Sequence, residues 1–320
     1  MTDVNALLPQ TYEFLRDHLK KTSGLMITPE KTYLLQSRLL PVAKKRGYDS
    51  LDQMVSALRM KPDKGLLDEI VESMTTNETY FFRDDKAFKQ LRENILPALL
   101  KSRESTKKLR IWSAASSTGQ EAYSMAMILD EVLSIKPGWS FEIVGTDISP
   151  AAVERAKKGE YSAFEVQRGL PIKSLMKYFT QTGQTWTAHD SLKKNINFRL
   201  YNLHDSFAPL GKFDLIVCRN VLIYFDDADK KKVLANMKTI LAPDGYLFLG
   251  SSETILGFSS EFTIIPNFPG FYSTVPLDET FKRLGVEDAG IKSFVRPQVT
   301  TQSSGLQARV VPTDSGFSRG

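Results

Sequence analysis

Cysteine is almost absent from this sequence. The single cysteine, Cys218, excludes a disulfide bond within the chain. No run of about 18 apolar residues offers a membrane span. The first residues, with Asp3, Asn5 and Pro9, also lack the charged and then apolar pattern of a secretory signal. We therefore expect a cytoplasmic protein without direct membrane insertion.

Histidine is scarce, and glycine-rich phosphate-binding motifs are missing. The three histidines, His18, His189 and His204, show no metal-ligand spacing, so we predict no metal site. Neither G-x-G-x-x-G nor G-x-x-x-x-G-K-[ST] occurs, although a pyrophosphate needs backbone without side chains to approach closely. A dinucleotide or ATP is therefore not the expected ligand.

The composition is that of a globular protein. With 320 residues, 42% of them hydrophobic, the chain can bury a substantial core and is long enough for two domains. The 42 basic and 37 acidic residues are mixed, so the net charge of +5 by itself indicates only a soluble surface. One stretch is locally basic, because residues 16–46 hold eight basic residues and two acidic ones. It either docks on an acidic partner or is a solvated helix face.

Two patterns divide the chain. Up to about residue 75, apolar residues recur at helical spacing, which predicts a small all-helical domain over 1–75, followed by a linker over 76–90. From Leu109 onward, strands alternate with helices. This alternation predicts an α/β domain over 91–276 with a mainly parallel, Rossmann-like sheet covered by helices on both faces.

Three segments depart from that alternation. Residues 159–195 fit it poorly and are interpreted as an inserted small subdomain. EFTIIPN and GFYSTV, on either side of residues 268–270, predict an antiparallel hairpin at the sheet edge. Residues 277–320 are interpreted as an extension that is partly disordered, since Ser, Thr, Gln and Gly dominate from about Val295.

Polar residues follow four predicted strands, where parallel sheets bind their ligands. They are Glu121 after the first, Asp147 after the second, Asn202 after the third, and Arg219 with Asn220 after the fourth. The apolar Leu203, next to Asn202, is a further candidate contact. The loop before Glu121 has a single glycine, which suits an adenosine without phosphates, as in S-adenosylmethionine. Asp147 would bond the ribose hydroxyls, and Glu121 or the Arg219-Asn220 turn would meet the cationic end.

Structural alternatives exist for these residues. Asp147 could cap the helix that follows Ser149-Pro150, and Glu121 could be a first-turn acid stabilised by the helix dipole. Arg219 is harder to explain in this way, because a charge after the apolar stretch FDLIV needs a partner or a solvent-filled cleft.

Longer motifs connect these residues to a known family. MTTNETYFFRD (74–84), WSAASSTGQEAYSMAM (112–127), GTDIS (145–149), YNL (201–203) and CRNVLIYFD (218–226) resemble the chemotaxis receptor methyltransferases, the CheR family. The similarity spans about residues 10–275 in the correct order. It implies a helical N-terminal domain, a linker and a class I methyltransferase domain that uses S-adenosylmethionine and leaves S-adenosylhomocysteine.

The resemblance also implies roles for individual residues. The family's cofactor contacts fall on Asn77, Thr79, Arg83, Glu121, Asp147, Asn202, Leu203, Arg219 and Asn220, and its methyl-transfer site on Arg83 and Tyr224. From the residues alone, Phe81 and Phe82 are packing residues of the linker, and Tyr224 could be a core aromatic. Asn77 and Thr79 could cap a helix that begins near Asp84.

The implied reaction is methylation of glutamate side chains on the cytoplasmic methylation helices of chemoreceptors, by a monomer recruited to membrane receptor arrays. Two rival functions are a nucleic-acid methyltransferase and a protein that senses the cofactor without turnover. Adenine methyltransferases usually have an Asn- or Asp-Pro-Pro-aromatic turn after the fourth strand, which holds a flipped base. This sequence has Cys-Arg-Asn-Val at that place, which argues against a nucleic-acid substrate. Retention of Arg83 and Tyr224 argues against a sensor. Binding of a receptor tether peptide is doubtful, because the stretch that ends the inserted subdomain is shorter than in the family members that bind such a peptide.

Overall fold

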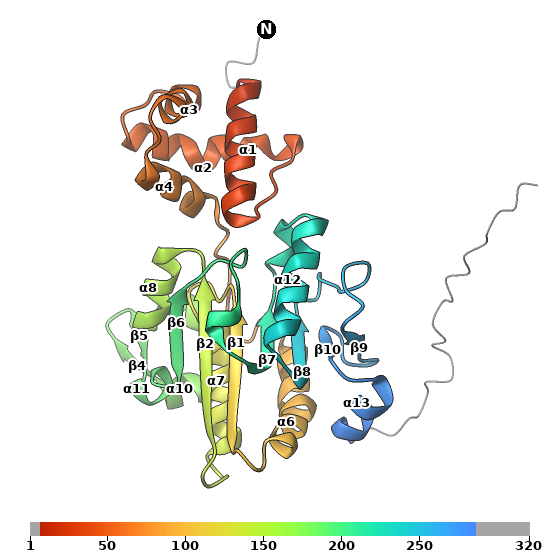
Figure 1. The fold of residues 1–320 in the computed structure, drawn as a ribbon. Coiled ribbons are helices and arrows are strands. Elements are labelled where there is room, and N and C mark those ends of the chain that lie inside the picture. The colour runs from red at the N-terminus through yellow and green to blue at the C-terminus, as the bar shows by residue number, and fades with distance from the viewer. Residues whose placement is uncertain (1–6, 286–320) are drawn as a thin grey trace, which may run out of the picture. The chain divides into compact units, whose positions relative to one another are not determined.

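The computed structural model describes residues 7–285. The N-terminal part is a bundle of α1 (Pro9–Ser23), α2 (Thr32–Lys45), α3 (Leu51–Met60) and α4 (Lys64–Met74), drawn from red to orange-brown in Figure 1. Two of the helices begin where a short polar side chain accepts a hydrogen bond from a backbone amide, Ser50 for α3 and Asp63 for α4. Buried leucines at helical spacing, among them Leu15, Leu19 and Leu39, form its core.

The linker predicted over 76–90 follows α4; residues 75–84 form neither helix nor strand, and a helix occupies 85–90. Its Phe81 is 0% exposed and packs edge-on against Tyr161 and Phe179, with ring centroids 5.0 and 5.7 Å away. Phe82 packs in the same way against Phe88. Both aromatic residues are therefore packing residues that fix the linker, as the sequence predicts.

A seven-stranded sheet forms the second part, in the order β6-β2-β1-β7-β8-β10-β9. Its strands are β1 (Lys108–Ala114), β2 (Ser140–Asp147), β6 (Ile196–Leu200), β7 (Phe213–Cys218), β8 (Leu241–Leu249), β9 (Thr263–Ile264) and β10 (Phe271–Ser273). The five strands from β6 to β8 are parallel, and β10 and β9 are antiparallel. The predicted Rossmann-like sheet with an antiparallel edge hairpin is confirmed.

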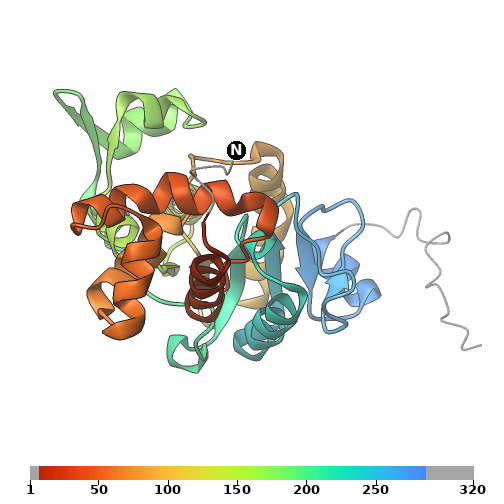
Figure 2. The same cartoon turned by 90° about the horizontal axis from the view of Figure 1, so that it is seen from above.

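Helices cover both faces of this sheet, and Figure 2 places α6 and α12 on opposite sides of it. The helices of this part are α5 (Asp85–Gln90), α6 (Leu96–Ser102), α7 (Gln120–Leu133), α8 (Pro150–Lys158), α12 (Asp227–Ile240) and α13 (Leu277–Leu284). A π-helical turn, Leu91–Ile95, joins α5 to α6. Within residues 7–285 no helix has the length and apolarity needed to cross a membrane.

The register brings the carboxyl ends of the strands together. Ala114 of β1 is paired with Thr146 of β2 on one side and with Cys218 of β7 on the other. The strand order changes direction between β1 and β7, and such a point leaves a crevice above the sheet. The loops that carry Glu121, Asp147 and Arg219 therefore meet at this crevice.

The inserted segment forms a lobe of its own, drawn in green in Figure 2. It contains β3 (Glu160–Ser162), α9 (Ala163–Gln167), α10 (Ile172–Tyr178), β4 (Phe179–Thr182), β5 (Thr185–Ala188) and α11 (Asp190–Lys193). The three strands make an antiparallel sheet in the order β3-β5-β4. The tail predicted to be disordered from about Val295 lies outside the described residues.

Candidate active site

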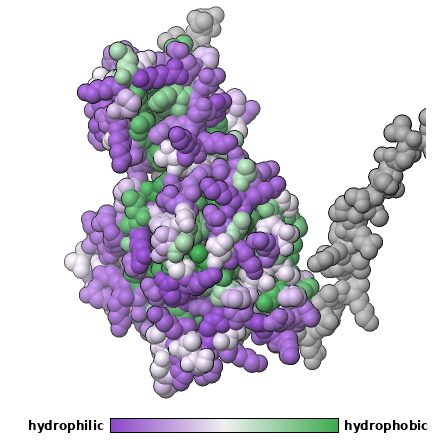
Figure 3. Space-filling view, in the orientation of Figure 1, coloured by the Kyte–Doolittle hydropathy of each residue, from purple (hydrophilic) through white to green (hydrophobic). Residues whose placement is uncertain are grey.

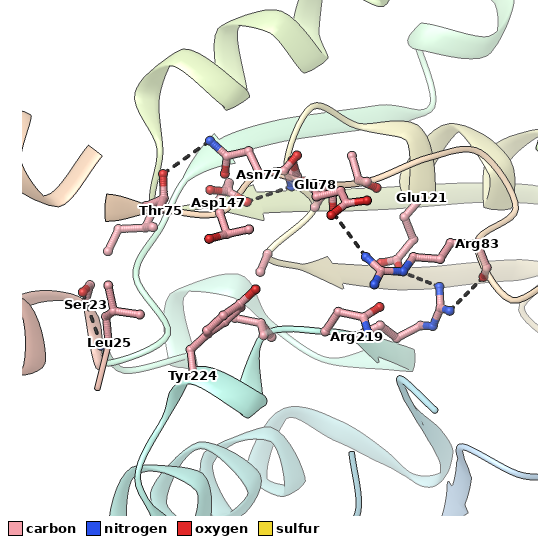
Figure 4. A pocket seen from close by; sticks show the side chains of 18 of the residues that line it. Ser23, Leu25, Thr75, Asn77, Glu78, Arg83, Glu121, Asp147, Arg219 and Tyr224 are labelled. Carbon is pink, nitrogen blue, oxygen red and sulfur yellow. Dashed lines mark hydrogen bonds and ion pairs between the residues drawn. The ribbon is translucent and has the colours of Figure 1, made fainter. Parts of the chain in front are cut away.

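A pocket lies where the carboxyl ends of β1, β2 and β7 meet the linker and the end of α1. It brings together eight of the residues singled out from the sequence: Asn77, Thr79, Arg83, Glu121, Asp147, Arg219, Asn220 and Tyr224. Figure 4 labels six of them around a common space: Asn77, Arg83, Glu121, Asp147, Arg219 and Tyr224. Residues far apart in the chain thus converge on one site.

Asn202 and Leu203 are not among the residues that line this pocket. Asn202 donates from Nδ2 to the carbonyl oxygen of Thr22 at 2.5 Å, and its Oδ1 accepts from the amide of His204 at 3.0 Å. Leu203 is buried in the hydrophobic core. Asn202 therefore attaches the end of β6 to the last turn of α1.

Asp147 ends β2 and is held by backbone amides. Its two carboxylate oxygens accept from the amides of Ser117 at 2.7 Å and Ser149 at 2.9 Å. Burial raises the pKa of Asp147, and these hydrogen bonds oppose the rise. The side chain that caps α8 is that of Ser149, which accepts from the amide of Ala152 at 3.0 Å. Asp147 is therefore not the cap, and each of its oxygens keeps a lone pair for a hydroxyl donor.

Glu121 occupies the first turn of α7, where the helix dipole favours negative charge. Its Oε1 accepts from the Ser113 hydroxyl at 2.9 Å, and its Oε2 lies 3.1 Å from Nη1 of Arg219. Burial raises the pKa of Glu121, while the positive charge of Arg219 opposes that rise. Glu121 is thus a carboxylate with a side chain only 12% exposed, and a positively charged neighbour stabilises its ionised form.

Arg219 follows β7 directly, and its side chain is only 1% exposed. Besides Glu121, its guanidinium contacts the carboxylate of Asp84 at 2.5 Å and the carbonyl oxygen of Arg83 at 2.8 Å. The rings of Phe248 and Phe88 lie 4.8 and 5.5 Å from its central carbon. The expectation that this charge needs a partner is confirmed, and the partners join β7 to the linker and to α7.

Arg83 and Tyr224 approach the pocket from different elements. Arg83 lies in the linker and donates from Nη1 to the carbonyl oxygen of Glu78 at 3.2 Å. Tyr224 ends the short helix Leu222–Tyr224, and its carbonyl oxygen accepts from the amide of Met26 at 3.0 Å. In Figure 4 its hydroxyl points into the pocket. Tyr224 is half-buried, packs against the hydrophobic core of the sheet and also lines the pocket.

The sequence did not reveal three residues that contribute to the site. Ser23, which ends α1, and Leu25, just after it, line the pocket, and no sequence signal indicates this. Glu253 accepts hydrogen bonds from the turn after β7 and was also missed. Glu253 follows β8 by four residues, so extending the search to the end of the fifth parallel strand would have found it.

The pocket suits a cationic nucleoside without phosphates. Glu78, Glu121 and Asp147 line it, and Arg83 and Arg219 are the basic residues among the lining. Arg219 is already paired with carboxylates. Asp147 can accept from ribose hydroxyls, and Glu121 can face a positive charge. Within residues 7–285, no group of three or more His, Cys, Asp or Glu side chains could hold a metal ion.

Comparisons with known proteins agree with this geometry. Residues 10–75 match the family described as "CheR methyltransferase, all-alpha domain", and residues 77–269 match "CheR methyltransferase, SAM binding domain". The chain is 38% identical over 263 residues to "Chemotaxis protein methyltransferase Cher2" of Pseudomonas putida, covering 81% of this chain and 95% of that protein.

Two further relatives give the same picture. "Chemotaxis protein methyltransferase 1" of Pseudomonas aeruginosa is 39% identical over 263 residues, with 81% and 95% of the two chains covered. "Chemotaxis protein methyltransferase" of Vibrio parahaemolyticus is 39% identical over 264 residues, with 82% and 95% covered. These matches span both the helical part and the sheet. The chain belongs to the CheR family of S-adenosylmethionine-dependent methyltransferases.

Proposed function

We propose that this protein transfers the methyl group of S-adenosylmethionine to glutamate side chains on the cytoplasmic methylation helices of chemoreceptors. The observation that carries the proposal is the convergence of Arg83 and Tyr224, two hydrogen-bond donors, on a pocket that holds buried carboxylates for a cationic nucleoside. The relatives' printed names, which place them in chemotaxis, support a receptor as the substrate.

The substrate needs no general base. A glutamate carboxylate has an unperturbed pKa of about 4.3, so it is already ionised and nucleophilic near neutral pH. In agreement, none of the described residues that line the pocket is a histidine or a cysteine. Hydrogen-bond donors that orient a carboxylate are what such a reaction requires.

The cofactor, when bound, supplies an electrophilic methyl group on a sulfonium. Asp147 would hold the ribose hydroxyls, and Glu121 would face the positively charged end. Arg83 and Tyr224 would orient one oxygen of the incoming carboxylate. A pocket that excludes water favours the transfer, because opposite charges partly cancel as the reaction proceeds.

Receptor fragments and labelled cofactor test this function. Incubation with S-adenosylmethionine carrying a labelled methyl group should label the cytoplasmic fragment of a cognate receptor, and mild base should release the label as methanol. DNA and RNA in parallel reactions should stay unlabelled. Label that resists mild base, or label on nucleic acid alone, would rule out the proposed reaction. If the protein binds the cofactor but transfers no methyl group to any receptor, a cofactor sensor is the remaining function.

The basic stretch at 16–46 supports a docking surface for the acidic methylation helices. Four of its basic residues lie on α2 or at its end, namely Arg38, Lys44, Lys45 and Arg46, and three of these have internal partners. Arg38 donates to the carbonyl oxygen of Met74 at 2.8 Å, and Lys45 and Arg46 each lie 2.7 Å from Glu69. Lys44 is exposed and has no acidic side chain within 4 Å among residues 7–285. We place the docking contact on Lys44. Figure 3 shows a largely hydrophilic surface on the helical part.

A charge reversal tests that surface. Lys44→Glu should weaken methylation at low salt by raising KM for the receptor, because long-range attraction becomes repulsion. Lys136→Glu, an exposed lysine after α7, is the matched control and should leave KM unchanged. Equal KM values for the two variants would show that Lys44 does not contact the receptor.

The short stretch that ends the inserted subdomain makes binding of a receptor tether peptide doubtful. We propose that methylation does not depend on a tether and that the enzyme acts as a monomer recruited to receptor arrays. Receptor fragments with and without their terminal residues should then be methylated at similar rates. A large loss on truncation would show that the tether is needed.

A further inference from the structure

The turn after β7 points three consecutive backbone amides at one side chain. The amides of Asn220, Val221 and Leu222 donate to the carboxylate of Glu253 at 2.7, 2.9 and 2.8 Å. The amide of Gly250 donates to the same carboxylate at 2.8 Å. Asn220 has a φ of 59°, in the left-handed region, and this conformation turns the successive amides to one side. Such a turn is a nest that binds an anion.

Glu253 fits this nest closely. The residue is 9% exposed, and four amide donors compensate the burial of its charge. Gly250 has room for no side chain, because a Cβ there would lie 2.8 Å from Oε2 of Glu253 and 3.1 Å from the amide nitrogen of Asn220. The carboxylate therefore holds the end of β8 and the turn after β7 in a fixed relation.

The same turn carries residues of the pocket. Asn220 lies in it, and Arg219 precedes it. The short helix that ends at Tyr224 begins at Leu222, whose amide bonds Glu253. The amide of Tyr224 in turn donates to the carbonyl oxygen of Val221 at 3.1 Å. Two hydrogen bonds thus connect the Glu253 carboxylate to the backbone of Tyr224.

We propose that Glu253 is a positioning residue for methyl transfer, because its carboxylate fixes the turn that presents Asn220 and Tyr224 to the pocket. This inference rests on the proposed function and adds a residue outside the pocket lining. Glu253 does not touch the reacting atoms, and its effect passes through the backbone of residues 220–224.

Kinetics test the proposal first. Glu253→Gln removes the charge and one acceptor, and kcat should fall on the order of 10- to 100-fold, as when supporting groups behind metal ligands are lost. Glu261→Gln makes the same change at an exposed residue of the same loop and should retain full activity. If the Gln variant does not fold, Glu253→Asp keeps the charge with a shorter reach and should show an intermediate loss. Full activity in the variants that fold would overturn the proposal.

A double-mutant cycle separates positioning from general damage. In a Tyr224→Phe background, Glu253→Gln should reduce kcat by a clearly smaller factor than in the wild type, because both changes affect the same group. A merely structural role predicts that the double variant loses kcat by the product of the two single-variant factors. A loss equal to that product would therefore contradict a role through Tyr224.

Hydrogen exchange provides a measurement that does not need a substrate. In Glu253→Gln or Glu253→Asp, the amides of residues 220–222 should exchange at least about 10-fold faster, with β7 protected as in the wild type. Unchanged exchange would overturn the positioning role, whatever the kinetics. If the wild type methylates no receptor, the proposed function fails while the exchange result still decides whether Glu253 holds the turn.

Discussion

Nη2 of Arg219 lies 2.5 Å from the carboxylate of Asp84, and so ties the end of β7 to the linker. The same guanidinium bonds the carbonyl oxygen of Arg83 and the carboxylate of Glu121. One buried cation therefore joins the sheet, the linker and α7 beside the pocket. The position of Arg83 depends on this junction.

Removal of Arg219 should destabilise the protein. Arg219→Ala leaves Glu121 buried without its cation, and we expect a loss of about 3 kcal/mol in the free energy of unfolding. That is the low end of the usual range, because the Asp84 side chain is 36% exposed. Arg219→Lys should recover only part of it, since an ammonium cannot reproduce the planar fork. Urea unfolding measures the change.

The control for that prediction is an exposed arginine. Arg16 pairs with its neighbour Asp17, and the two side chains are 38% and 66% exposed. Arg16→Ala should cost much less than Arg219→Ala, because solvent screens this pair. Similar losses for Arg16→Ala and Arg219→Ala would show that the junction contributes no special stability.

Arg83→Ala and Tyr224→Phe should lower turnover more than cofactor affinity. Loss of one donor to the reacting carboxylate should reduce kcat on the order of 100-fold. The Kd for S-adenosylmethionine, measured by calorimetry, should change less than kcat, because the proposed mechanism uses both side chains as donors to the incoming carboxylate, although the resemblance also implies a cofactor contact for Arg83. Arg199→Ala, an exposed residue of β6, is the control. If cofactor binding and activity fall together, Arg83 and Tyr224 are cofactor ligands and not substrate donors.

Gly169 should tolerate no side chain, because the inserted subdomain approaches the linker there. A Cβ at Gly169 would lie 2.1 Å from the carbonyl oxygen of Phe81, two residues before Arg83. Gly169→Ala should therefore displace the linker and lower both the melting temperature and turnover. Gly183 also has a positive φ but has nothing within 4 Å of its Cβ position. Gly183→Ala thus measures backbone strain alone, and equal effects of the two changes would exclude a tight contact.

Cofactor affinity should fall as the pH is lowered. The fall should begin at a pH above about 4, the ordinary pKa of a carboxyl group. Burial raises the pKa of Asp147 and of Glu121 in the free protein. A cationic ligand with hydroxyl donors stabilises the ionised carboxylates, so binding lowers these pKa values and releases protons. Calorimetry in buffers of different ionisation enthalpy measures that release. Affinity that is constant or rises towards acid pH would contradict this assignment.

Local patterns in the sequence identified most elements of the site. The helix expected after Ser149-Pro150 is α8, which Ser149 caps and Gly159 ends. Glu121 and Asp147 were found because parallel strands place their carboxyl ends at one edge of the sheet. The need of Arg219 for a partner followed from its position after a buried strand.

The contacts that the sequence did not reveal join residues far apart in the chain. Asn202 was expected among the cofactor contacts, yet it bonds Thr22, 180 positions earlier. Glu253 bonds a turn 31 to 33 positions before it. Hydrophobic periodicity and helix caps are local signals, so they carry no information about which distant backbone groups a polar side chain will meet.

The most direct test of the account is a crystal structure with S-adenosylhomocysteine bound. We predict the nucleoside across the carboxyl ends of β1, β2 and β7, with its ribose hydroxyls at Asp147 and its sulfur facing the space between Arg83 and Tyr224. A nucleoside bound elsewhere, or one whose sulfur faces away from both side chains, would contradict it.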